Sequence, residues 1–183
     1  MARKESVTKN IIIETAFQMT REEGFSLVTA RRLANRIGCS TQPIFRVYEN
    51  MGELKNEIFI KSKYFFESFY DDYPKTSTVP FENLGLAYIQ FAEKESKLFQ
   101  LLFLSEDRVE KNLYELLNGN KGAVKKEIQR AAEAGCKDPS NLFMKMWIFI
   151  HGAACMSITG DYDLSVEETA DLLVESYLAY SRN

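Results

Sequence analysis

Side chains that bind phosphate are concentrated in one short stretch of the sequence, residues 29–48, which reads TARRLANRIGCSTQPIFRVY. The stretch holds four arginines, whose guanidinium groups stay charged and donate several hydrogen bonds to phosphate oxygens. The whole chain has a net charge of -3, but residues 1–63 hold 11 Lys/Arg against 7 Asp/Glu, a balance of +4, and residues 64–183 hold 12 against 19, a balance of -7. The basic front of the chain indicates a polyanionic partner.

Residues suited to metal binding or redox chemistry are few. His151 is the only histidine, and the three cysteines, Cys39, Cys136 and Cys155, are widely spaced without a C-x-x-C pair, so we predict neither a disulfide framework nor a zinc knuckle. His151 and Cys155 lie one helical turn apart and could form half of a metal or redox site. A core histidine with a satisfied hydrogen bond is the favoured interpretation.

Sequence motifs of enzymes are also missing. The chain has no glycine-rich phosphate loop, no G-x-S-x-G elbow and no H-E-x-x-H pair, and its acidic residues are dispersed. We therefore predict a protein that is not an enzyme, with no catalytic residue, no metal ligand and no cofactor.

The elements that position these residues are expected to be helices. Apolar residues recur at helical spacing along almost the whole chain, and no stretch shows a sustained period of two. We predict an all-α fold, and glycine, proline and aspartate mark most of the joints between helices. The expected helices cover about 8–24, 29–37, 40–48, 52–70, 80–94, 96–104, 109–134 with an interruption at NGNKG, 139–159 and 165–181.

The N-terminus and the most apolar window give no sign of a membrane. The apolar run 11–13 is followed at once by Glu14, so we expect no signal peptide. The most apolar window, 142–158, is shorter than the roughly 20 residues of a spanning helix and contains Lys145 and His151. We interpret it as a buried helix and expect a cytoplasmic protein with no membrane partner.

Two of the expected helices form a helix-turn-helix pattern. Thr29 opens the first, and Gly38 ends it at a turn. We expect the hydroxyl of Ser40 to cap the second helix, where Pro43 fits inside the first turn because its missing N–H costs no internal hydrogen bond there. Such a second helix enters the major groove of duplex DNA, while the first crosses the backbone.

On that arrangement the second helix would present its N-terminal side chains to DNA. Thr41, Gln42, Pro43 and Arg46 would project toward base edges or nearby phosphates. The arginines of the preceding helix, of which Arg31 is one, cannot all face the DNA. A solvated basic face is the alternative interpretation of this stretch.

At these residues the chain resembles the TetR family of bacterial transcriptional repressors. The resemblance runs from Ile12 to Leu54: an apolar first helix ending in EEGF at 22–25, then TARRLANRIGCSTQPIFRVYENMGEL. It implies an N-terminal three-helix helix-turn-helix DNA-binding domain, which we place over 1–52, followed by a helical ligand-binding and dimerisation domain over 53–183. The positions that match signature residues of the family are Leu33, Ala34, Gly38, Ser40, Phe45, Tyr48 and Leu54.

Pattern and resemblance together give a set of candidate DNA-binding residues. Phe45 stands where the family usually has a tyrosine that contacts phosphate, and Met51 stands where it usually has lysine, so both of those phosphate contacts are missing here. Lys55 could substitute in part, and the N-terminal arm could reach phosphate or the minor groove. The full set is Arg3, Lys4, Thr29, Arg31, Ser40, Thr41, Gln42, Pro43, Phe45, Arg46, Tyr48 and Lys55.

The remainder of the chain, which the resemblance implies is a ligand-binding domain, is rich in aromatic residues. We assign most of them to the core and expect the rest to line a cavity for a small apolar or aromatic ligand. The candidate ligand-binding residues are Phe65, Phe69, Tyr88, Phe91, Phe103, Tyr114, Trp147 and His151.

The resemblance further implies a homodimer in which the last two helices pair with their copies as a four-helix bundle. The candidates for those apolar faces, shared between the dimer and each chain's own core, are Met144, Ile148, Cys155, Ile158, Leu172, Leu173, Tyr177 and Tyr180. A two-fold dimer would read a palindromic operator in double-stranded DNA.

The function that follows from these expectations is sequence-specific transcriptional repression, released when a small-molecule effector binds. The alternative is a helix-turn-helix adaptor whose helical domain binds a protein partner instead of a small molecule. A cavity in the helical domain distinguishes the two, since an adaptor needs none.

Overall fold

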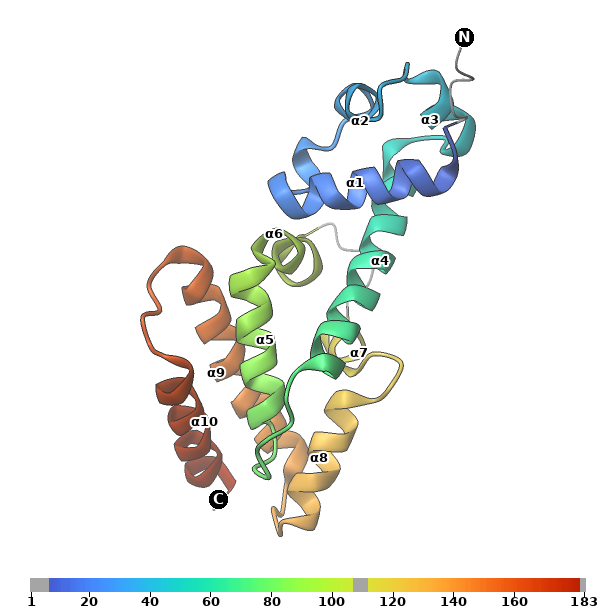
Figure 1. The fold of residues 1–183 in the computed structure, drawn as a ribbon. Coiled ribbons are helices and arrows are strands. Elements are labelled where there is room, and N and C mark those ends of the chain that lie inside the picture. The colour runs from blue at the N-terminus through green and yellow to red at the C-terminus, as the bar shows by residue number, and fades with distance from the viewer. Residues whose placement is uncertain (1–6, 107–111, 182–183) are drawn as a thin grey trace. The chain divides into compact units, whose positions relative to one another are not determined.

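The computed structural model describes residues 7–106 and 112–181, and every regular element in these ranges is helical, which confirms the all-α prediction (Figure 1). A 3₁₀ turn, Phe25–Leu27, follows the first helix, and a π-helical turn, Gln100–Leu104, extends the sixth. The α-helices are α1 (Lys9–Glu23), α2 (Ala30–Ile37), α3 (Gln42–Val47), α4 (Met51–Asp72), α5 (Glu82–Lys94), α6 (Ser96–Phe99), α7 (Leu113–Asn118), α8 (Ala123–Glu133), α9 (Pro139–Thr159) and α10 (Val166–Ser181).

Capping residues set the limits of the first two helices where the sequence indicates. The hydroxyl of Thr8 accepts a hydrogen bond from the Ile11 N–H at 3.3 Å, and the hydroxyl of Thr29 accepts one from the Arg32 N–H at 3.2 Å. Gly38 ends α2 at φ 79°, a left-handed conformation that glycine adopts without strain. The turn between α2 and α3 therefore needs this glycine.

The start of α3 differs from the expectation. The helix begins at Gln42 and Thr41 is its N-cap, so the prediction that Ser40 caps this helix is wrong. Thr41 has helical dihedrals, φ -71° and ψ -16°, and no side chain caps the helix, because a capping side chain needs an extended backbone at that position. Pro43 lies in the first turn, as predicted.

The chain divides into two compact units, one made of 7–65 and 97–106 and the other of 66–96 and 112–181. The division falls inside α4, after Phe65, because the first half of that helix contributes Leu54, Ile58 and Phe59 to the core of the first unit. The domain boundary at residue 52 stays a prediction.

The second unit is built around α5, which packs against α9 and α10. A Cβ atom on Gly85 would lie 3.1 Å from side-chain atoms of Ile150 and Leu173, so the three helices approach closely at this glycine. Helix α8 packs on α7 and α9. The segment 109–134, expected as one helix with an interruption, contains two helices, and Gly119 and Gly122 between them have positive φ.

Helix α9 is the one helix in the described ranges that is long and apolar enough to cross a membrane by length and composition. Core helices share these two properties. The prediction of a buried helix over 142–158 holds for one face of α9, which is buried within the second unit. The buried residues are Leu142, Phe143, Met146, Trp147, Ile150, Ala153 and Ala154.

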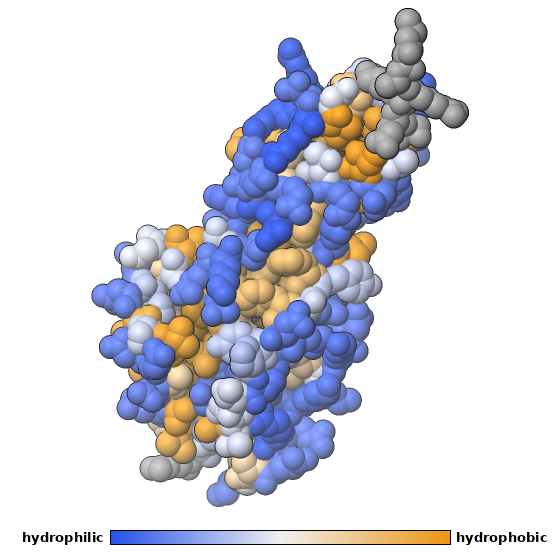
Figure 2. All heavy atoms as spheres, viewed as in Figure 1, coloured by the Kyte–Doolittle hydropathy of each residue, from blue (hydrophilic) through white to orange (hydrophobic). Residues whose placement is uncertain are grey.

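The other side of α9 leaves apolar side chains exposed. Met144, Ile148 and Met156 are solvent-accessible, and Ile148 is the most exposed of them at 67 %. Leu178 and Tyr180 are exposed on α10. Figure 2 shows hydrophobic side chains among hydrophilic ones over this part of the second unit. Such a surface is typical of an interaction site.

Candidate functional site

Helix α3 turns one apolar side inward and a mixed side outward. Ile44 and Tyr48 are buried in the core of the first unit. Gln42, Phe45 and Arg46 are exposed, and half of the Phe45 side chain is accessible to solvent. The exposed side therefore combines a hydrogen-bonding amide, an aromatic ring and a cation, three groups that can contact a DNA groove.

The four arginines of the opening stretch have two different roles. Arg36 binds Glu22 of α1 through two hydrogen-bonded atom pairs, at 2.6 and 2.9 Å, and this contact lowers the pKa of Glu22 and raises that of Arg36. Arg32 pairs with Glu23 and donates to the carbonyl oxygen of Leu27 at 3.1 Å. Both residues hold α2 against its own unit.

The other two of the four arginines are Arg31 and Arg46. Both are exposed, and neither has an ion-pair partner in residues 7–106 or 112–181. Arg31 lines a surface hollow of about 480 Å³ at the turn between α2 and α3, together with Asn35, Ser40 and Thr41. The structure therefore brings Arg31, Ser40 and Thr41 together as a polar, positively charged surface beside α3.

Two other candidate residues have structural contacts. The hydroxyl of Thr29 caps α2. Tyr48 is only 3 % exposed, and its hydroxyl donates to Glu57 at 2.7 Å. Burial opposes the charged form of Glu57, but hydrogen bonds from Lys9 and Tyr48 outweigh it and lower the pKa of this carboxyl. Tyr48 therefore helps to position α3, and the DNA contact expected of it from the sequence stays a prediction.

The remaining DNA-binding candidates lie at the edges of this surface. Pro43 is half-buried in the first turn of α3. Lys55 is half-buried on α4, with its ammonium group 6.0 Å from the centre of the Phe25 ring. Arg3 and Lys4 lie outside the described residues.

Five of the eight candidate ligand-binding residues lie in an aromatic cluster of the second unit, where Tyr88, Phe91 and Trp147 are buried and Phe69 and His151 are half-buried. The Tyr88 hydroxyl is 2.9 Å from Nδ1 of His151, and the Trp147 ring stacks on His151 with centroids 5.5 Å apart. Tyr88 also packs edge-on against Trp147 at 4.8 Å. Phe69 packs on Phe91 at 5.3 Å, and Phe66 joins this pair to Tyr88.

The other three candidates lie elsewhere. Phe65 packs on Phe17 at 5.8 Å, and Phe103 is buried beside Phe99, both within the first unit. Tyr114 is exposed on α7 and touches Phe143 edge-on. The eight residues therefore do not form a single site, and their role in ligand binding stays a prediction.

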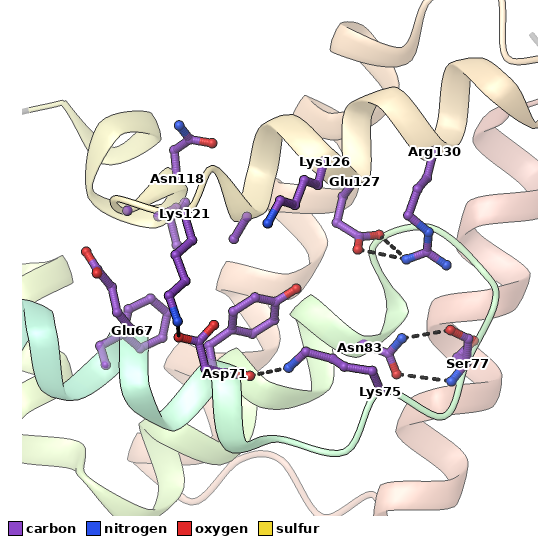
Figure 3. Close-up of a pocket in the computed structure, with 15 residues that line it drawn as sticks. Glu67, Asp71, Lys75, Ser77, Asn83, Asn118, Lys121, Lys126, Glu127 and Arg130 are labelled. Carbon is purple, nitrogen blue, oxygen red and sulfur yellow. Dashed lines mark hydrogen bonds and ion pairs between the residues drawn. The ribbon is translucent and has the colours of Figure 1, made fainter.

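A cavity of about 420 Å³ lies in the second unit, and none of the eight candidates lines it (Figure 3). Its walls come from the end of α4, the segment 75–83 and the region of α7 and α8. The lining residues are Phe66, Glu67, Tyr70, Asp71, Lys75, Ser77, Asn83, Leu117, Asn118, Gly119, Lys121, Ala123, Lys126, Glu127 and Arg130.

The carboxylates of this cavity all have partners. Asp71 pairs with Lys121 at 2.6 Å. Glu127 is buried and accepts hydrogen bonds from Arg130 at 2.7 and 2.8 Å and from the Phe81 N–H at 2.7 Å. Glu67 accepts two hydrogen bonds from Asn120, at 3.3 and 3.2 Å.

Two lysines of the cavity contact no carboxylate of the part of the chain that the structure describes. Lys75 donates to the backbone carbonyl oxygens of Tyr70 and Tyr73 and lies 3.7 Å from the centre of the Tyr70 ring. Burial lowers the pKa of Lys75 and, with the nearby charge of Glu127, raises the pKa of Tyr70 to about 12. Lys126 is exposed and forms no ion pair within the described residues. The cavity is therefore apolar in part and positively charged in excess.

Comparison with known proteins identifies the fold. No family model and no curated sequence matches the chain. Among solved structures, a TetR-like transcriptional regulator from Rhodococcus sp. RHA1 superimposes with a TM-score of 0.66 at 14% identity, covering 99% of both chains. A putative TetR-family regulator from Vibrio parahaemolyticus gives 0.63 at 17% identity, with 93% of this chain and 97% of that chain covered. A putative TetR-family regulator from Rhodococcus sp. gives 0.59 at 13% identity, with 93% and 96% covered.

The chain has the TetR-family fold. The expectation drawn from residues 12–54 is thereby confirmed at the level of fold, over nearly the whole chain. In the TetR fold of this protein, α2 and α3 are the helix-turn-helix, and α5 and α7 to α10 lie in the second unit.

Sequence reasoning missed the charged residues that line the cavity of this TetR fold. Lys75, Lys121 and Lys126 come from a loop, a turn and a helix, and nothing in their spacing relates them. The spacing of four residues between Lys126 and Arg130 on α8 was the one indication in the sequence that these cations share a helical face. Which aromatic residues line the cavity depends on helix packing, and the sequence does not show it.

Proposed function

We propose that the chain is a DNA-binding transcription regulator that acts as a homodimeric repressor. The observation that carries the proposal is the exposed side of α3 beside two arginines, Arg31 and Arg46, that no carboxylate of the described residues neutralises. On a helix-turn-helix within the TetR fold, these two cations can bind the phosphates and base edges of a DNA duplex.

The proposed contacts fall into two groups. Gln42, Phe45 and Arg46 on α3 reach into the major groove, where Arg46 reads guanine or binds a flanking phosphate. Arg31, Ser40 and Thr41 at the preceding turn contact the backbone. Further contacts on either side come from Pro43, Lys55 and, at the N-terminus, Arg3 and Lys4.

The proposed dimer forms through the exposed apolar residues of α9 and α10. One six-residue recognition helix reads only a few base pairs. Two copies related by a two-fold axis would read a palindromic operator whose half-sites lie about 34 to 36 Å apart. Because the proposed target is duplex DNA, we expect the protein to act in the cytoplasm.

The proposed regulation is release from DNA when a small molecule binds in the helical part. The cavity of about 420 Å³ favours this over the adaptor alternative, which needs no cavity. A coupling of about 1 to 3 kcal/mol between the two sites would change DNA affinity by roughly 5 to 150-fold.

Paired arginine variants test the DNA-binding surface. In Arg31→Ala/Arg46→Ala the two unneutralised cations are lost, and we expect affinity for a DNA duplex to fall at least about 30-fold and the salt slope of binding to drop by about 2. In the control, Arg32→Ala/Arg36→Ala, two arginines bound to Glu22 and Glu23 are lost, and affinity should stay within about threefold because exposed ion pairs contribute little.

Fluorescence anisotropy with labelled duplexes from about 0.05 to 0.3 M salt measures both effects. Circular dichroism melting of each variant checks that the helices remain folded. Equal binding by the two double variants contradicts the proposed surface, and so does a larger loss in the control at unchanged melting temperature.

A further inference from the structure

We propose that the cavity of the second unit binds an amphipathic organic anion, with the apolar body of the ligand on Phe66, Tyr70 and Leu117 and its carboxylate toward Lys126. This inference rests on the proposed function, because it names the chemical class of the effector. It also differs from the sequence-based expectation of a ligand held by the aromatic core cluster, since none of those eight residues lines this cavity.

The volume and the walls of the cavity fit such a ligand. Pockets for small organic molecules enclose about 300 to 1,000 Å³, and this cavity of about 420 Å³ holds a body of roughly ten carbon atoms with a head group. Phe66 and Leu117 are buried residues that form part of its wall, and Ala123 and the Tyr70 ring add further apolar surface. An aromatic ring or an alkyl chain would find apolar contact there.

The charges of the cavity select an anion. Four cationic side chains line it against three carboxylates, and each carboxylate already accepts hydrogen bonds from protein groups. Lys126 is the lining cation whose side chain forms neither an ion pair nor a hydrogen bond within the described ranges, and Figure 3 shows this side chain extending from α8 into the cavity. A carboxylate beside Lys126 gains a charge-assisted hydrogen bond without breaking any existing pair.

Ligands of other charge fit less well. A cationic ligand would need a carboxylate, and taking Asp71 or Glu127 from its present partner leaves Lys121 or Arg130 without one. A neutral ligand gains the apolar contacts but leaves Lys126 with water alone. The ammonium of Lys75 contacts backbone oxygens and the rings of Tyr70 and Tyr73 but no carboxylate of the described residues, so its charge adds to the positive potential that an anion enters.

Matched probes separate charge from shape. We would measure by calorimetry how tightly the full chain binds 4-phenylbutyrate and decanoate. Each acid is compared with its neutral amide and with the amine of equal length. Each acid should bind at least about tenfold more tightly than its amide, which corresponds to about 1.4 kcal/mol, and the amines should bind most weakly. Equal affinity of acid and amide for both bodies, or no binding of either acid at millimolar concentration, overturns the inference.

Variants of neighbouring lysines locate the carboxylate. Lys126→Met removes the charge and keeps the stem, so the preference for acid over amide should fall below about threefold. Lys125→Met is the matched control: Lys125 is exposed on the same helix and does not line the cavity, so the preference should be unchanged. Lys126→Glu should favour the amine over the acid. If the acid still binds more tightly than the amide in both Lys126→Met and Lys126→Glu, the carboxylate of the ligand does not lie beside Lys126.

DNA binding by the same samples distinguishes this inference from the proposed function. If the acids bind with the expected preference but Arg31→Ala/Arg46→Ala still binds duplex DNA as the unmodified protein does, the cavity assignment stands and the DNA-binding proposal fails. If the arginine variants behave as expected and no acid is preferred, the DNA-binding proposal stands and the effector class is wrong.

Discussion

At the scale of single residues, partners decide what each charged side chain can do. Arg32 and Arg36 are bound to acidic residues of α1, whereas Arg31 and Arg46 are left with their charge exposed. Side-chain type and spacing alone could not make this division, because Glu22 and Glu23 lie on a different helix from the arginines. The basic stretch was recognisable from the sequence, but the cations available to DNA were not.

The exposed ring of Phe45 gives a gain-of-function prediction. The resemblance to the TetR family implies a phosphate contact through a tyrosine hydroxyl at this position, and half of the Phe45 side chain is accessible to solvent. Phe45→Tyr should therefore strengthen DNA binding about three- to tenfold, the effect of one added solvent-accessible hydrogen bond of roughly 0.5 to 1.5 kcal/mol.

Anisotropy titration with the same duplex measures this change, and Phe149→Tyr is the control, because Phe149 is half-buried on α9 in the second unit and lies outside the proposed contact set. Unchanged or weaker binding by the Phe45 variant would show that this ring does not lie near a phosphate.

At the scale of elements, the sequence predicts helix ends that depend on local signals, but not features that depend on tertiary packing. Thr8, Thr29 and Gly38 set helix ends as expected, because caps and left-handed glycines act within one turn of the chain. Ser40 did not cap α3, since the helical dihedrals of Thr41 displaced the start of that helix. The walls of the cavity join α4, a loop and α8, and no local pattern predicts such an arrangement.

Glu127 on α8 fixes the loop that leads into α5. Its carboxylate accepts from Arg130 and from the N–H of Phe81, a residue with φ 68° that adopts the left-handed conformation without being glycine. Glu127→Gln removes the charge that these donors share, and we expect the free energy of unfolding to fall by about 1 to 3 kcal/mol.

Urea unfolding at one protein concentration measures this loss. The control is Glu133→Gln on the same helix, where an exposed carboxylate accepts from Gln129 alone among the described residues, so the midpoint should hardly move. Equal midpoints for the two variants would contradict the role given to Glu127.

At the scale of the whole molecule, the TetR fold leaves apolar residues of α9 and α10 exposed. The sequence predicted a buried helix over 142–158, which holds for one face of α9 only, because the sequence could not divide the apolar positions between the core and an outer surface. Ile148 is exposed and Ile150 is buried, although the two have the same side chain. Their places on the helix relative to α5 and α10 decide the difference.

A charge on the outer surface of α9 tests the dimer. We expect Ile148→Glu to shift the protein to monomers at micromolar concentration, because a carboxylate would be buried without a partner in the apolar interface. Ile60→Glu is the matched control, with 47 % of its side chain exposed on α4 in the first unit, and it should leave the dimer intact. Sedimentation velocity distinguishes the two, and a dimer of unchanged affinity for Ile148→Glu would place the interface elsewhere.

Selection of the purified protein against a random duplex library at about 0.15 M salt, followed by sequencing, tests the central claim most directly. A dimeric helix-turn-helix regulator should enrich a palindrome whose half-sites are centred about 10 base pairs apart, one turn of the duplex. Enrichment of no sequence at all would contradict sequence-specific DNA binding and leave the arginines of residues 29–48 as a solvated basic face.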